Sequence, residues 1–478
     1  MGKSYDLVII GSGPNGLSAG IYLAQAGYQV LILEAAESVG GGMRTAELSI
    51  PGFHHDVCSA VHPTGYLSPY FKELELEKYG LEWVFPEASV AHPLDDGPAV
   101  LLSKSVEETA IRLGRDAKAY KRLIGPIANN IEGLLADSLG PLSFPKDPIN
   151  FVRFGMRAGL PANFLSKLVF KEEAARALFA GCAAHSILPF SKLFTAALGV
   201  VFLATGHAVD WPMPKGGSQS LANALLACFE KAGGSIEFGK RIKNFSELPE
   251  AKAYIFDTDP FQLAHICKDH LPSSYKNKLL RYHFGPGVFK IDYALKEPIP
   301  WKDPNCLKAS TIHVGGTLEE IAQGEKEAWE GKISQSPYVL MAQQSQFDPT
   351  RAPEGQHTCW AYCHVPFGST VDMSEIIENQ IERFAPGFRD VILAKSSMNS
   401  PAFEAYNPNY VGGAVTGGAA DITQLFTRPV GLINPYSTPN EKIFICSAST
   451  PPGGGVHGMN GYHAAKAVEK QLKKGIKA

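Results

Sequence analysis

Several classes of protein are disfavoured by what this sequence has little of. Charged residues make up 19% of its 478 residues, below the usual share of about 25%. Since the formal net charge is −3, the chain lacks the excess of positive charge that holds nucleic acid, and we expect no nucleic-acid partner. The apolar share of 45% is sufficient for a large folded core and argues against a disordered chain.

Cysteine is also sparse, with eight residues in the chain, too few for a disulfide scaffold. Cys359 and Cys363 lie four positions apart in a segment whose alternation predicts a strand, so we expect two buried thiols on one face. No CxxC or CxxxxC pair follows the first glycine motif, and no cysteines or histidines have the spacing of metal ligands. We expect no metal and a reducing, cytoplasmic environment.

Long hydrophobic runs are absent as well. The longest apolar stretch, Leu193 to Thr205, is well short of the roughly 20 residues that a membrane-spanning helix needs. A strand pattern begins at Tyr5 and leaves no room for a signal peptide. We therefore expect a cytoplasmic protein without a transmembrane span. A basic amphipathic stretch at 151–171 leaves two interpretations open: a helical surface over a core, or peripheral contact with an anionic membrane.

Motifs of several other enzyme classes are missing. The sequence contains no GxSxG nucleophile elbow, which argues against a hydrolase of that type. It also contains no HExxH zinc motif, no EF-hand loop and no Walker A motif. The glycine clusters of the chain are more informative.

The first glycine cluster, residues 11–16, predicts a dinucleotide site of the Rossmann type. It follows the apolar run 7–10, precedes a helical pattern, and is followed by a second apolar run that ends in Glu34. Glycines there allow a tight turn and close approach of a pyrophosphate to the helix N-terminus, and the acid accepts hydrogen bonds from ribose hydroxyls. The residues expected to contact the nucleotide are Gly11, Ser12, Gly13, Pro14, Asn15, Gly16, Glu34 and Ala35.

A second glycine turn follows directly, Gly40-Gly41-Gly42-Met43-Arg44-Thr45. It resembles the GG-x-R-[ST] continuation of flavoproteins in the phytoene desaturase and amine oxidase superfamily, which simple NAD dehydrogenases lack. The resemblance implies FAD as the cofactor. Its physical basis is a turn that brings backbone N–H groups and Arg44 towards the ribityl and pyrophosphate region, with contacts from Gly41, Gly42, Met43 and Arg44.

Two later segments have the same strand, glycine loop and helix pattern. In the middle of the chain, Pro214 to Ser218 precedes a helical pattern, a strand at 235–238 and Ile242. Near the C-terminus, a strand at 442–446 leads into a glycine loop and a final helical pattern. We expect both to complete one discontinuous nucleotide-binding domain. The expected contacts in the last loop are Gly455, Val456, Gly458 and Met459.

Longer strings extend the resemblance over almost the whole chain. The chain resembles the phytoene desaturase branch of FAD-dependent oxidoreductases and, more closely, the group called pyridine nucleotide-disulfide oxidoreductase domain-containing protein 2. The strings lie at 51–63, 92–97, 183–186, 285–295, 347–351 and 450–461. The resemblance implies that Ile242 offers its backbone to the adenine and that the last glycine loop lies beside the isoalloxazine. Because no CxxxxC pair and no second GxGxxG occur, disulfide reductase activity is not carried over.

The predicted fold class is α/β, with a discontinuous Rossmann-type FAD-binding domain, a mixed-sheet substrate domain and a helical subdomain. The FAD-binding domain is expected from 1–70, 210–270 and 430–478. Strand-like alternation in 271–429, together with 71–104, predicts the substrate domain. The mainly helical pattern of 105–209 predicts a subdomain at the substrate entry or facing a membrane.

Three functions remain open at this point. The first is an FAD-dependent oxidoreductase acting on CH–CH or related donors of an apolar, isoprenoid or polyene-like substrate, as a desaturase, dehydrogenase or flavin-dependent isomerase. The second is a flavin amine oxidase, which needs an aromatic cage around an uncharged amine. The third is an interaction or regulatory protein that FAD stabilises.

Candidate catalytic residues are His457, His55 and Asp56. His457 lies in the last glycine loop, and the near-neutral pKa of histidine suits proton transfer; its alternative role is to pack that loop. Asp56 could orient His55, although structural hydrogen bonding explains the pair equally simply. Lys290 and Asp292 share one strand face and are expected to be a solvated or cross-strand pair.

Overall fold

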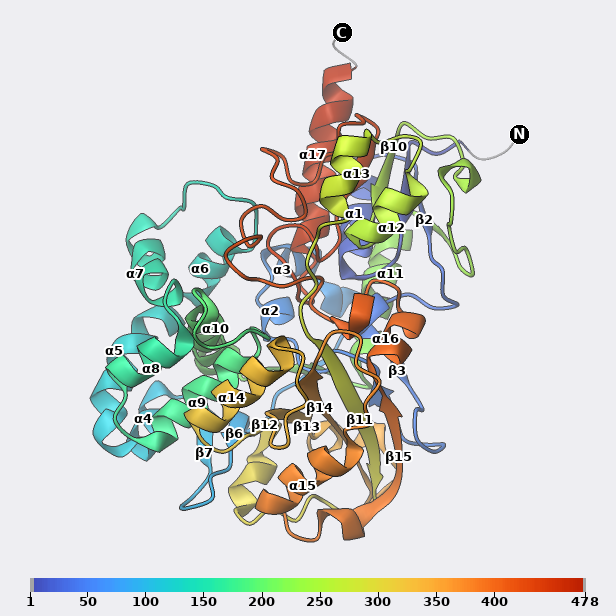
Figure 1. Cartoon of the computed structure of the whole chain (residues 1–478). Helices are drawn as coiled ribbons and strands as arrows, with labels where there is room; N and C mark the ends of the chain where they lie inside the picture. The colour runs from blue at the N-terminus through green and yellow to red at the C-terminus, as the bar shows by residue number, and fades with distance from the viewer. Residues whose placement is uncertain (1–3, 476–478) are drawn as a thin grey trace.

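The computed structural model describes residues 4–475, and two sheets organise it (Figure 1). The first has five strands in the order β16-β10-β1-β2-β9, all parallel. Its strands are β1 (Leu7–Ile10), β2 (Val30–Leu33), β9 (Ser235–Glu237), β10 (Ala253–Phe256) and β16 (Ile443–Ile445). Four of the five are continuous apolar runs buried on both faces, as expected for a parallel sheet covered by helices.

Helices cover both faces of this five-stranded sheet. Leu7 and Ile9 of β1 face a core shared with α1 (Pro14–Gln25), α11 (Ser218–Lys231) and α17 (Met459–Gly475). Val8 and Ile10 face the opposite core, shared with α12 (Pro260–Ile266) and α13 (Ser273–Leu279). Since the strands come from three distant segments, the sheet joins residues near both ends of the described chain.

The second sheet has seven strands in the order β15-β11-β14-β13-β12-β6-β7. Neighbours are antiparallel except for β12 and β6, so the sheet is mixed. The strands are β6 (Ala88–His92), β7 (Val100–Ser103), β11 (Gly287–Leu295), β12 (Ala309–Val314), β13 (Val339–Ala342), β14 (His357–Val365) and β15 (Ile392–Met398). One face packs on α15 (Ser374–Phe384), beneath the sheet in Figure 1.

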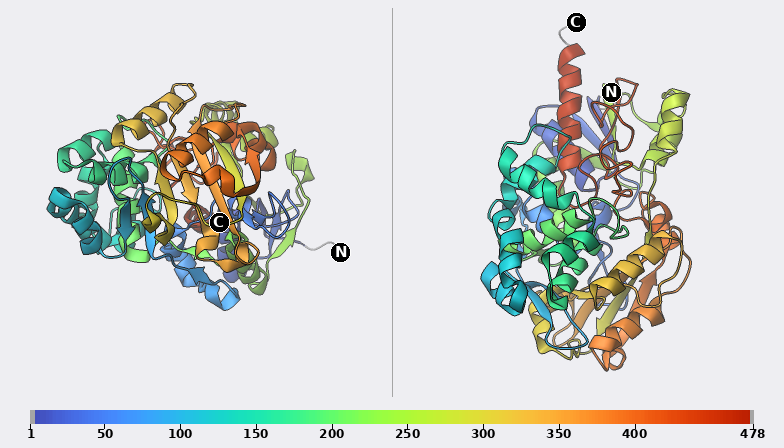
Figure 2. Two further views of the ribbon diagram at one scale, coloured as in Figure 1. Left: turned by 90° about the horizontal axis from the view of Figure 1, so that it is seen from below. Right: turned by 60° about the vertical axis from the view of Figure 1, so that its left-hand side comes forward.

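The third region consists of helices on the left of Figure 1. They are α4 (Val106–Arg112), α5 (Ala117–Ala128), α6 (Ile131–Ser138), α7 (Pro148–Ala158), α8 (Ala162–Val169), α9 (Glu173–Ala184) and α10 (Thr195–Val209). Helix α10 lies among the others, and the second view of Figure 2 shows them stacked beside both sheets. α14 (Leu318–Trp329) contacts α9 and β14, so it joins this region to the seven-stranded sheet.

Shorter elements connect the three regions. The strand pairs are β3 (Thr45–Ala46) with β4 (His55–Asp56), and β5 (Trp83–Val84) with β8 (Met213–Pro214). Short helices α2 (Pro63–Tyr66), α3 (Pro69–Leu74) and α16 (Ser400–Tyr406) lie near the junction of the two sheets.

The predicted fold class is confirmed: the protein is α/β, with a Rossmann-like parallel sheet, a mixed sheet and many helices. The three-part division into domains stays a prediction. The hydrophobic cores, however, group some residues near the predicted domain boundaries differently. Tyr70, Leu74 and Leu81 pack in a core of the parallel sheet, as do Tyr275 and Leu279. The segments around residues 81 and 279 therefore pack with the five-stranded sheet, although the prediction put both in the substrate domain.

The eight cysteines are free thiols, and Cys359 and Cys363 are buried on one face of β14, as predicted. Among residues 4–475, no group of three or more His, Cys, Asp or Glu side chains is arranged so that it could bind a metal ion. The described helices include none with both the length and the apolar character of a membrane span.

The close crossing between helices α1 and α17 depends on glycine. A Cβ atom added at Gly461 would lie 1.8 Å from the backbone oxygen of Asn15. No relaxation of a side chain could relieve this overlap, because the opposing atom belongs to the backbone of α1. The spacing of the two helices is therefore fixed by the missing side chain.

We expect Gly461→Ala to lower the free energy of unfolding by about 1–3 kcal/mol, because the added methyl group overpacks this crossing. Gly155→Ala on α7 is the matched control, since nothing lies within 4 Å of its added Cβ; it should raise stability by up to about 1 kcal/mol. Chemical denaturation measures both changes. Equal effects of the two substitutions would contradict this account of the crossing.

Candidate cofactor and substrate cavity

One large cavity, of about 770 Å³, runs between the two sheets and the helical region. It begins where β1, β2 and β10 end, at Ile10, Leu33 and Asp257. It reaches the inner face of the seven-stranded sheet, whose strands contribute Val288, Lys290, Thr311, Leu340, Trp360 and Tyr362 to its lining. Ligands of open α/β sheets bind at this carboxyl edge of the parallel strands.

Glu34 organises the nucleotide end of the cavity. Its Oε2 accepts hydrogen bonds from the backbone N–H of Ser12 at 2.8 Å and from the Ser12 hydroxyl at 2.5 Å. Its Oε1 accepts from the N–H of Ala36 at 2.9 Å and lies 3.2 Å from Nη2 of Arg44. The carboxylate of Glu34 thus links the first glycine turn, through Ser12, to the second, through Arg44. It can do so in addition to contacting a ribose hydroxyl.

Polar atoms without protein partners remain at this end. Nε of Arg44 and Oδ1 of Asn15 are buried without a hydrogen-bond partner, and both residues line the cavity. Gly13 caps α1 without any side chain, and Asp257 accepts from the N–H of Gly16, so the N–H of Asn15 is the group of the first turn that remains for a ligand. An unpaired guanidinium N–H and a free N–H at a helix N-terminus both favour an anion. The residues present therefore fit the phosphates of a dinucleotide.

Thirteen of the residues predicted to bind the cofactor line the cavity, and four do not. Those that line it are Gly11, Ser12, Gly13, Pro14, Asn15, Glu34, Ala35, Gly41, Gly42, Arg44, Ile242, Gly455 and Val456. Outside the lining are Gly16, Met43, Gly458 and Met459. Gly16 faces the backbone oxygen of Gly11, and Gly458 faces Ser18, so these two serve close packing.

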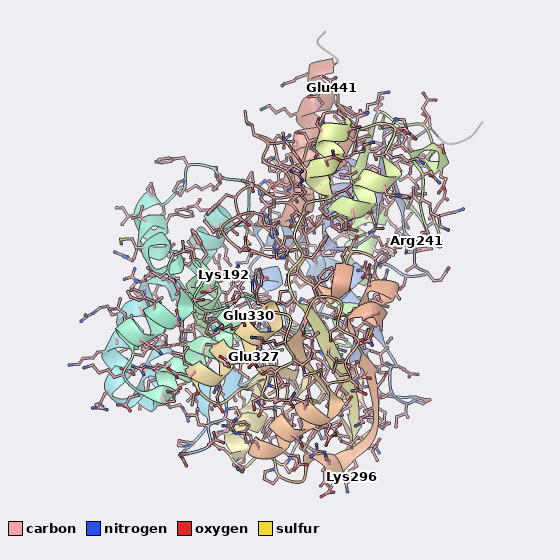
Figure 3. All side chains as sticks on the ribbon, viewed as in Figure 1. Lys192, Arg241, Lys296, Glu327, Glu330 and Glu441 are labelled. Atoms are coloured by element: carbon pink, nitrogen blue, oxygen red, sulfur yellow. The ribbon has the colours of Figure 1, made fainter. Side chains whose placement is uncertain are left out.

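Figure 3 labels, among others, one residue on each side of the molecule, Arg241 and Lys192. Arg241, on the right, lines the cavity beside Lys240 and Ile242, so the nucleotide end has a basic rim. Lys192, on the left, precedes the cavity-lining Phe194 by two residues and lies 3.7 Å above the ring of Trp329. The cavity thus extends from the nucleotide sheet to the helical region.

Asp257 is a site residue that sequence reasoning missed. Its Oδ2 accepts a hydrogen bond from the N–H of Gly16 at 2.9 Å, and a Cβ at Gly13 would lie 2.8 Å from the same oxygen. Burial raises the pKa of Asp257 to about 8. The available signal was its position directly after the apolar run 253–256, because side chains at the carboxyl end of a parallel strand lie at the ligand edge.

The three predicted catalytic residues lie outside the cavity lining. His457 is buried, its Nδ1 accepts from the N–H of Met459 at 3.2 Å, and burial lowers its pKa to about 4. Burial also lowers the pKa of His55 to about 3, and His55 Nε2 lies 2.7 Å from the hydroxyl of Ser49. Asp56 bonds to Arg351 through its carboxylate. These contacts correspond to the alternative roles given above: His457 packs the last glycine loop, and His55 and Asp56 make structural hydrogen bonds.

The expectation of a solvated Lys290–Asp292 pair is wrong. Both side chains are buried, and Nζ of Lys290 lies 2.5 Å from each carboxylate oxygen of Asp292. The two-residue spacing correctly predicts that Lys290 and Asp292 share one face of β11. That face is buried inside the protein rather than exposed to water. Lys290 lines the cavity, 5.8 Å from the ring centre of Trp360. Burial raises the pKa of Asp292 to about 6.

The rest of the lining is mainly apolar. Phe194, Leu198 and Phe202 contribute from α10 and the residue before it, and Trp211 follows the same helix. On the sheet side, the rings of Trp360 and Tyr362 lie 5.4 Å apart. This half of the cavity suits an apolar ligand.

Known proteins were found that resemble this chain, and one of the matches covers the two glycine turns that line the cavity. Residues 9–74 match a model of the NAD(P)-binding Rossmann-like domain. The chain is 25% identical to the mouse (Mus musculus) protein called pyridine nucleotide-disulfide oxidoreductase domain-containing protein 2, over 98% of this chain and 94% of that one. The predicted resemblance is confirmed.

Two further similarities cover nearly the whole chain. A limonene dehydrogenase component from Castellaniella defragrans is 24% identical, over 98% of this chain and 95% of its own. A crystal structure of an oxidoreductase from Methanosarcina mazei superposes with a TM-score of 0.67 at 16% identity, over 97% of this chain and 99% of that one. The prediction of an oxidoreductase agrees with the names of these relatives.

Asp257 should make the stability of the protein depend on pH. Its folded pKa of about 8 lies above the ordinary 3.8, so between these values the folded protein keeps a proton that the unfolded chain releases. The free energy of unfolding should therefore fall as pH rises through this window. Relative to Asp257→Asn, which does not titrate, the wild type should lose up to about 1.4 kcal/mol per pH unit.

Denaturation of both proteins across this pH window, at equal cofactor saturation, measures the difference. Asp96→Asn, on an exposed loop, is the control and should follow the wild type. Parallel curves for the wild type and Asp257→Asn would show that the carboxyl group does not carry the proton.

Proposed function

We propose that the protein is an FAD-dependent oxidoreductase that withdraws electrons from an apolar, isoprenoid or polyene-like substrate. The observation that carries this proposal is the continuity of the cavity. One space joins the nucleotide motifs at Gly11 to Gly13 with the apolar walls of α10 and the mixed sheet. A dinucleotide held at the first part would extend its reactive end into the second.

The chain offers specific groups to such a cofactor. The N–H of Asn15 in the first turn of α1 and the unpaired Nε of Arg44 would hold the pyrophosphate, and the rim at Ile242 would receive the adenine. Gly455 and Val456 would place backbone N–H groups next to the ring system. When bound, the flavin supplies a two-electron acceptor for a hydride from the substrate.

Lys290 is the side chain that we propose to handle the proton. Among the residues that the mixed sheet contributes to the lining, it alone carries a charge. Both carboxylate oxygens of Asp292 hold its Nζ in a fixed position, so the ammonium group can release a proton to Asp292 as it accepts one from the substrate. His457, His55 and Asp56 then support the loop and the sheet rather than touching substrate.

An amine oxidase is the weaker alternative. That reaction needs aromatic rings on opposite sides of an uncharged amine. Trp360 and Tyr362 alternate with Ala361 on β14, so their side chains share one wall. The opposing wall contributes Leu198 and Phe202 from α10 within a long apolar lining. This arrangement favours an extended apolar substrate.

Anaerobic absorbance spectroscopy of the purified protein tests the proposal. The flavin spectrum should bleach with a polyene or isoprenoid hydrocarbon delivered in detergent, and NADPH and simple amines should leave it unchanged. Bleaching by amines would instead establish the amine oxidase. A preparation that binds no flavin under any condition would overturn the proposal altogether.

Gly13→Glu should abolish flavin binding. The new side chain would start 2.8 Å from Asp257 Oδ2 and fill the space proposed for the pyrophosphate with a second negative charge. Gly125→Glu on α5, where nothing lies within 4 Å of the added Cβ, is the matched control and should retain flavin. Absorbance after gel filtration measures both, and retained flavin in Gly13→Glu would contradict the assignment of this loop.

We propose further that the helical region docks reversibly on an anionic membrane. Ile149, Val152 and Met156 form an exposed apolar face of α7, with exposed fractions of 74%, 58% and 66%. Arg153 lies on the same helix, and residues 148–171 contain no acidic side chain. Apolar side chains flanked by basic ones are typical of helices that lie at a bilayer surface. The cavity-lining Phe194 packs nearby on Gly159, directly after α7.

Replacing Val152 and Met156 together by aspartate should reduce co-sedimentation with phosphatidylserine-containing vesicles at least tenfold. The physical reason is that each side chain contributes about 1.5–3 kcal/mol when it leaves water. Ile111→Asp changes an exposed isoleucine of α4 outside this face and should bind as the wild type does. If the wild type itself does not sediment with the vesicles, the docking proposal is wrong.

A further inference from the structure

A pair of histidines, of which His313 is buried and His185 half-buried, forms part of the cavity wall where α9, α10 and β12 meet. His185 directly follows α9 and lines the cavity, with the ring of Phe202 at 4.5 Å and that of Trp211 at 5.7 Å between ring centres. His313 lies on β12 behind it and is fully buried. Neither residue belongs to the nucleotide end, and the proposed function gives neither a role.

The two rings share one hydrogen bond. Nε2 of His185 lies 3.2 Å from Nε2 of His313. A bond between two such nitrogens needs one proton, so one ring donates and the other accepts. Burial lowers the pKa of His185 to about 3 and also lowers the pKa of His313. Both rings are therefore neutral near pH 7, and each carries a single N–H.

The burial of His313 decides which ring donates. Its Nδ1 is buried without a partner. If His185 donated, the proton of His313 would sit on this nitrogen as a buried N–H without an acceptor, which proteins rarely tolerate. If His313 donates, its Nδ1 carries only a lone pair. The proton of His185 then resides on Nδ1, for which the described residues provide no hydrogen-bond partner.

Two hydroxyl groups lie on the same wall. Thr311 precedes His313 by two positions on β12 and so shares its face of the sheet. Thr311 lines the cavity, is 2% exposed, and its Oγ1 has no partner. Ser186, next to His185, also lines the cavity with an unpartnered Oγ. Unsatisfied buried polar groups are costly, and these two hydroxyls, together with the unpartnered Nδ1 of His185, point to a ligand that satisfies them.

We propose that His185, Thr311 and Ser186 bind an uncharged oxygen, a carbonyl or hydroxyl group, at one end of an otherwise apolar substrate. Nδ1–H of His185 donates to this oxygen, and the two hydroxyls donate or accept as its chemistry requires. The neutral histidine pair offers no charge to a carboxylate, and the ammonium group of Lys290 on the same sheet is already bound by both carboxylate oxygens of Asp292. The substrate class is therefore an oxygenated isoprenoid rather than a plain hydrocarbon or an acid; this refinement rests on the proposed function.

A matched series of ligands tests this recognition on the flavin-loaded protein. Myrcene, geraniol, citral and geranic acid share an acyclic monoterpene skeleton and differ in the group at one end. Binding is followed by perturbation of the flavin spectrum and by the shift in Tm. Geraniol or citral should bind about tenfold more tightly than myrcene, because a buried polar wall left unpaired by the hydrocarbon weakens its complex.

Two variants locate the effect. His185→Phe keeps a ring of similar size but loses the donor, and Thr311→Val keeps the shape but loses the hydroxyl. Each should reduce the preference for geraniol over myrcene about three- to tenfold, while flavin remains bound. Thr358→Val is the matched control: Thr358 is also buried with an unpartnered hydroxyl but lies outside this cavity. It should leave the preference unchanged.

The outcomes separate this inference from the proposed function. Equal binding of myrcene and geraniol by a protein that carries flavin would overturn the inference alone. Tighter binding of geranic acid than of geraniol would do the same, because it would place the polar end of the ligand at Lys290 rather than at the uncharged histidine pair. An unchanged preference in both His185→Phe and Thr311→Val would assign the selectivity to other residues and overturn the inference as well. Absence of flavin from the wild type would instead remove the proposed function.

Discussion

The fully buried carboxylate of Asp56 is the contact on which the relative placement of the two sheets depends. It accepts hydrogen bonds from Arg351 Nη2 at 2.7 Å, from the Thr45 hydroxyl at 2.8 Å and from the N–H of Ser218 at 2.8 Å. These donors come from the segment between β13 and β14, from the second glycine turn and from the start of α11. A buried charge is tolerated only when it is fully paired, so all three segments must meet before any one of them is stable there.

Much of the cofactor end of the site could be predicted from the sequence because its determinants are local. A strand, a glycine turn and a helix follow one another within about 25 residues in such motifs, and the turn at Gly11 shows this pattern in the letters alone. Strand alternation likewise placed Lys290 and Asp292 on one face. It could not show that the face is buried, because the segment packed against it includes His55, whose ring lies 3.7 Å from Asp292 and which is far away in the sequence.

The remainder of the site arises from contacts between distant segments. His185 and His313 are 128 positions apart, and no spacing rule links a residue after a helix to one in a strand. The catalytic predictions for His457, His55 and Asp56 stay predictions; all three residues lie outside the cavity lining, and closeness in sequence to a glycine motif does not ensure access to it. Asp257 could have been found by extending the rule for parallel strands to the third apolar run.

The order of strands in the parallel sheet has a consequence for how the protein is made. β10 lies between β1 and β16, and β16 follows every residue of the helical region and the mixed sheet along the chain. During synthesis the sheet therefore keeps an open hydrogen-bonding edge on β10 until the other two regions have emerged from the ribosome. The cavity, to which the loop after β16 contributes Gly455 and Val456, becomes complete last, so loading of the proposed cofactor would serve as a late checkpoint of correct folding.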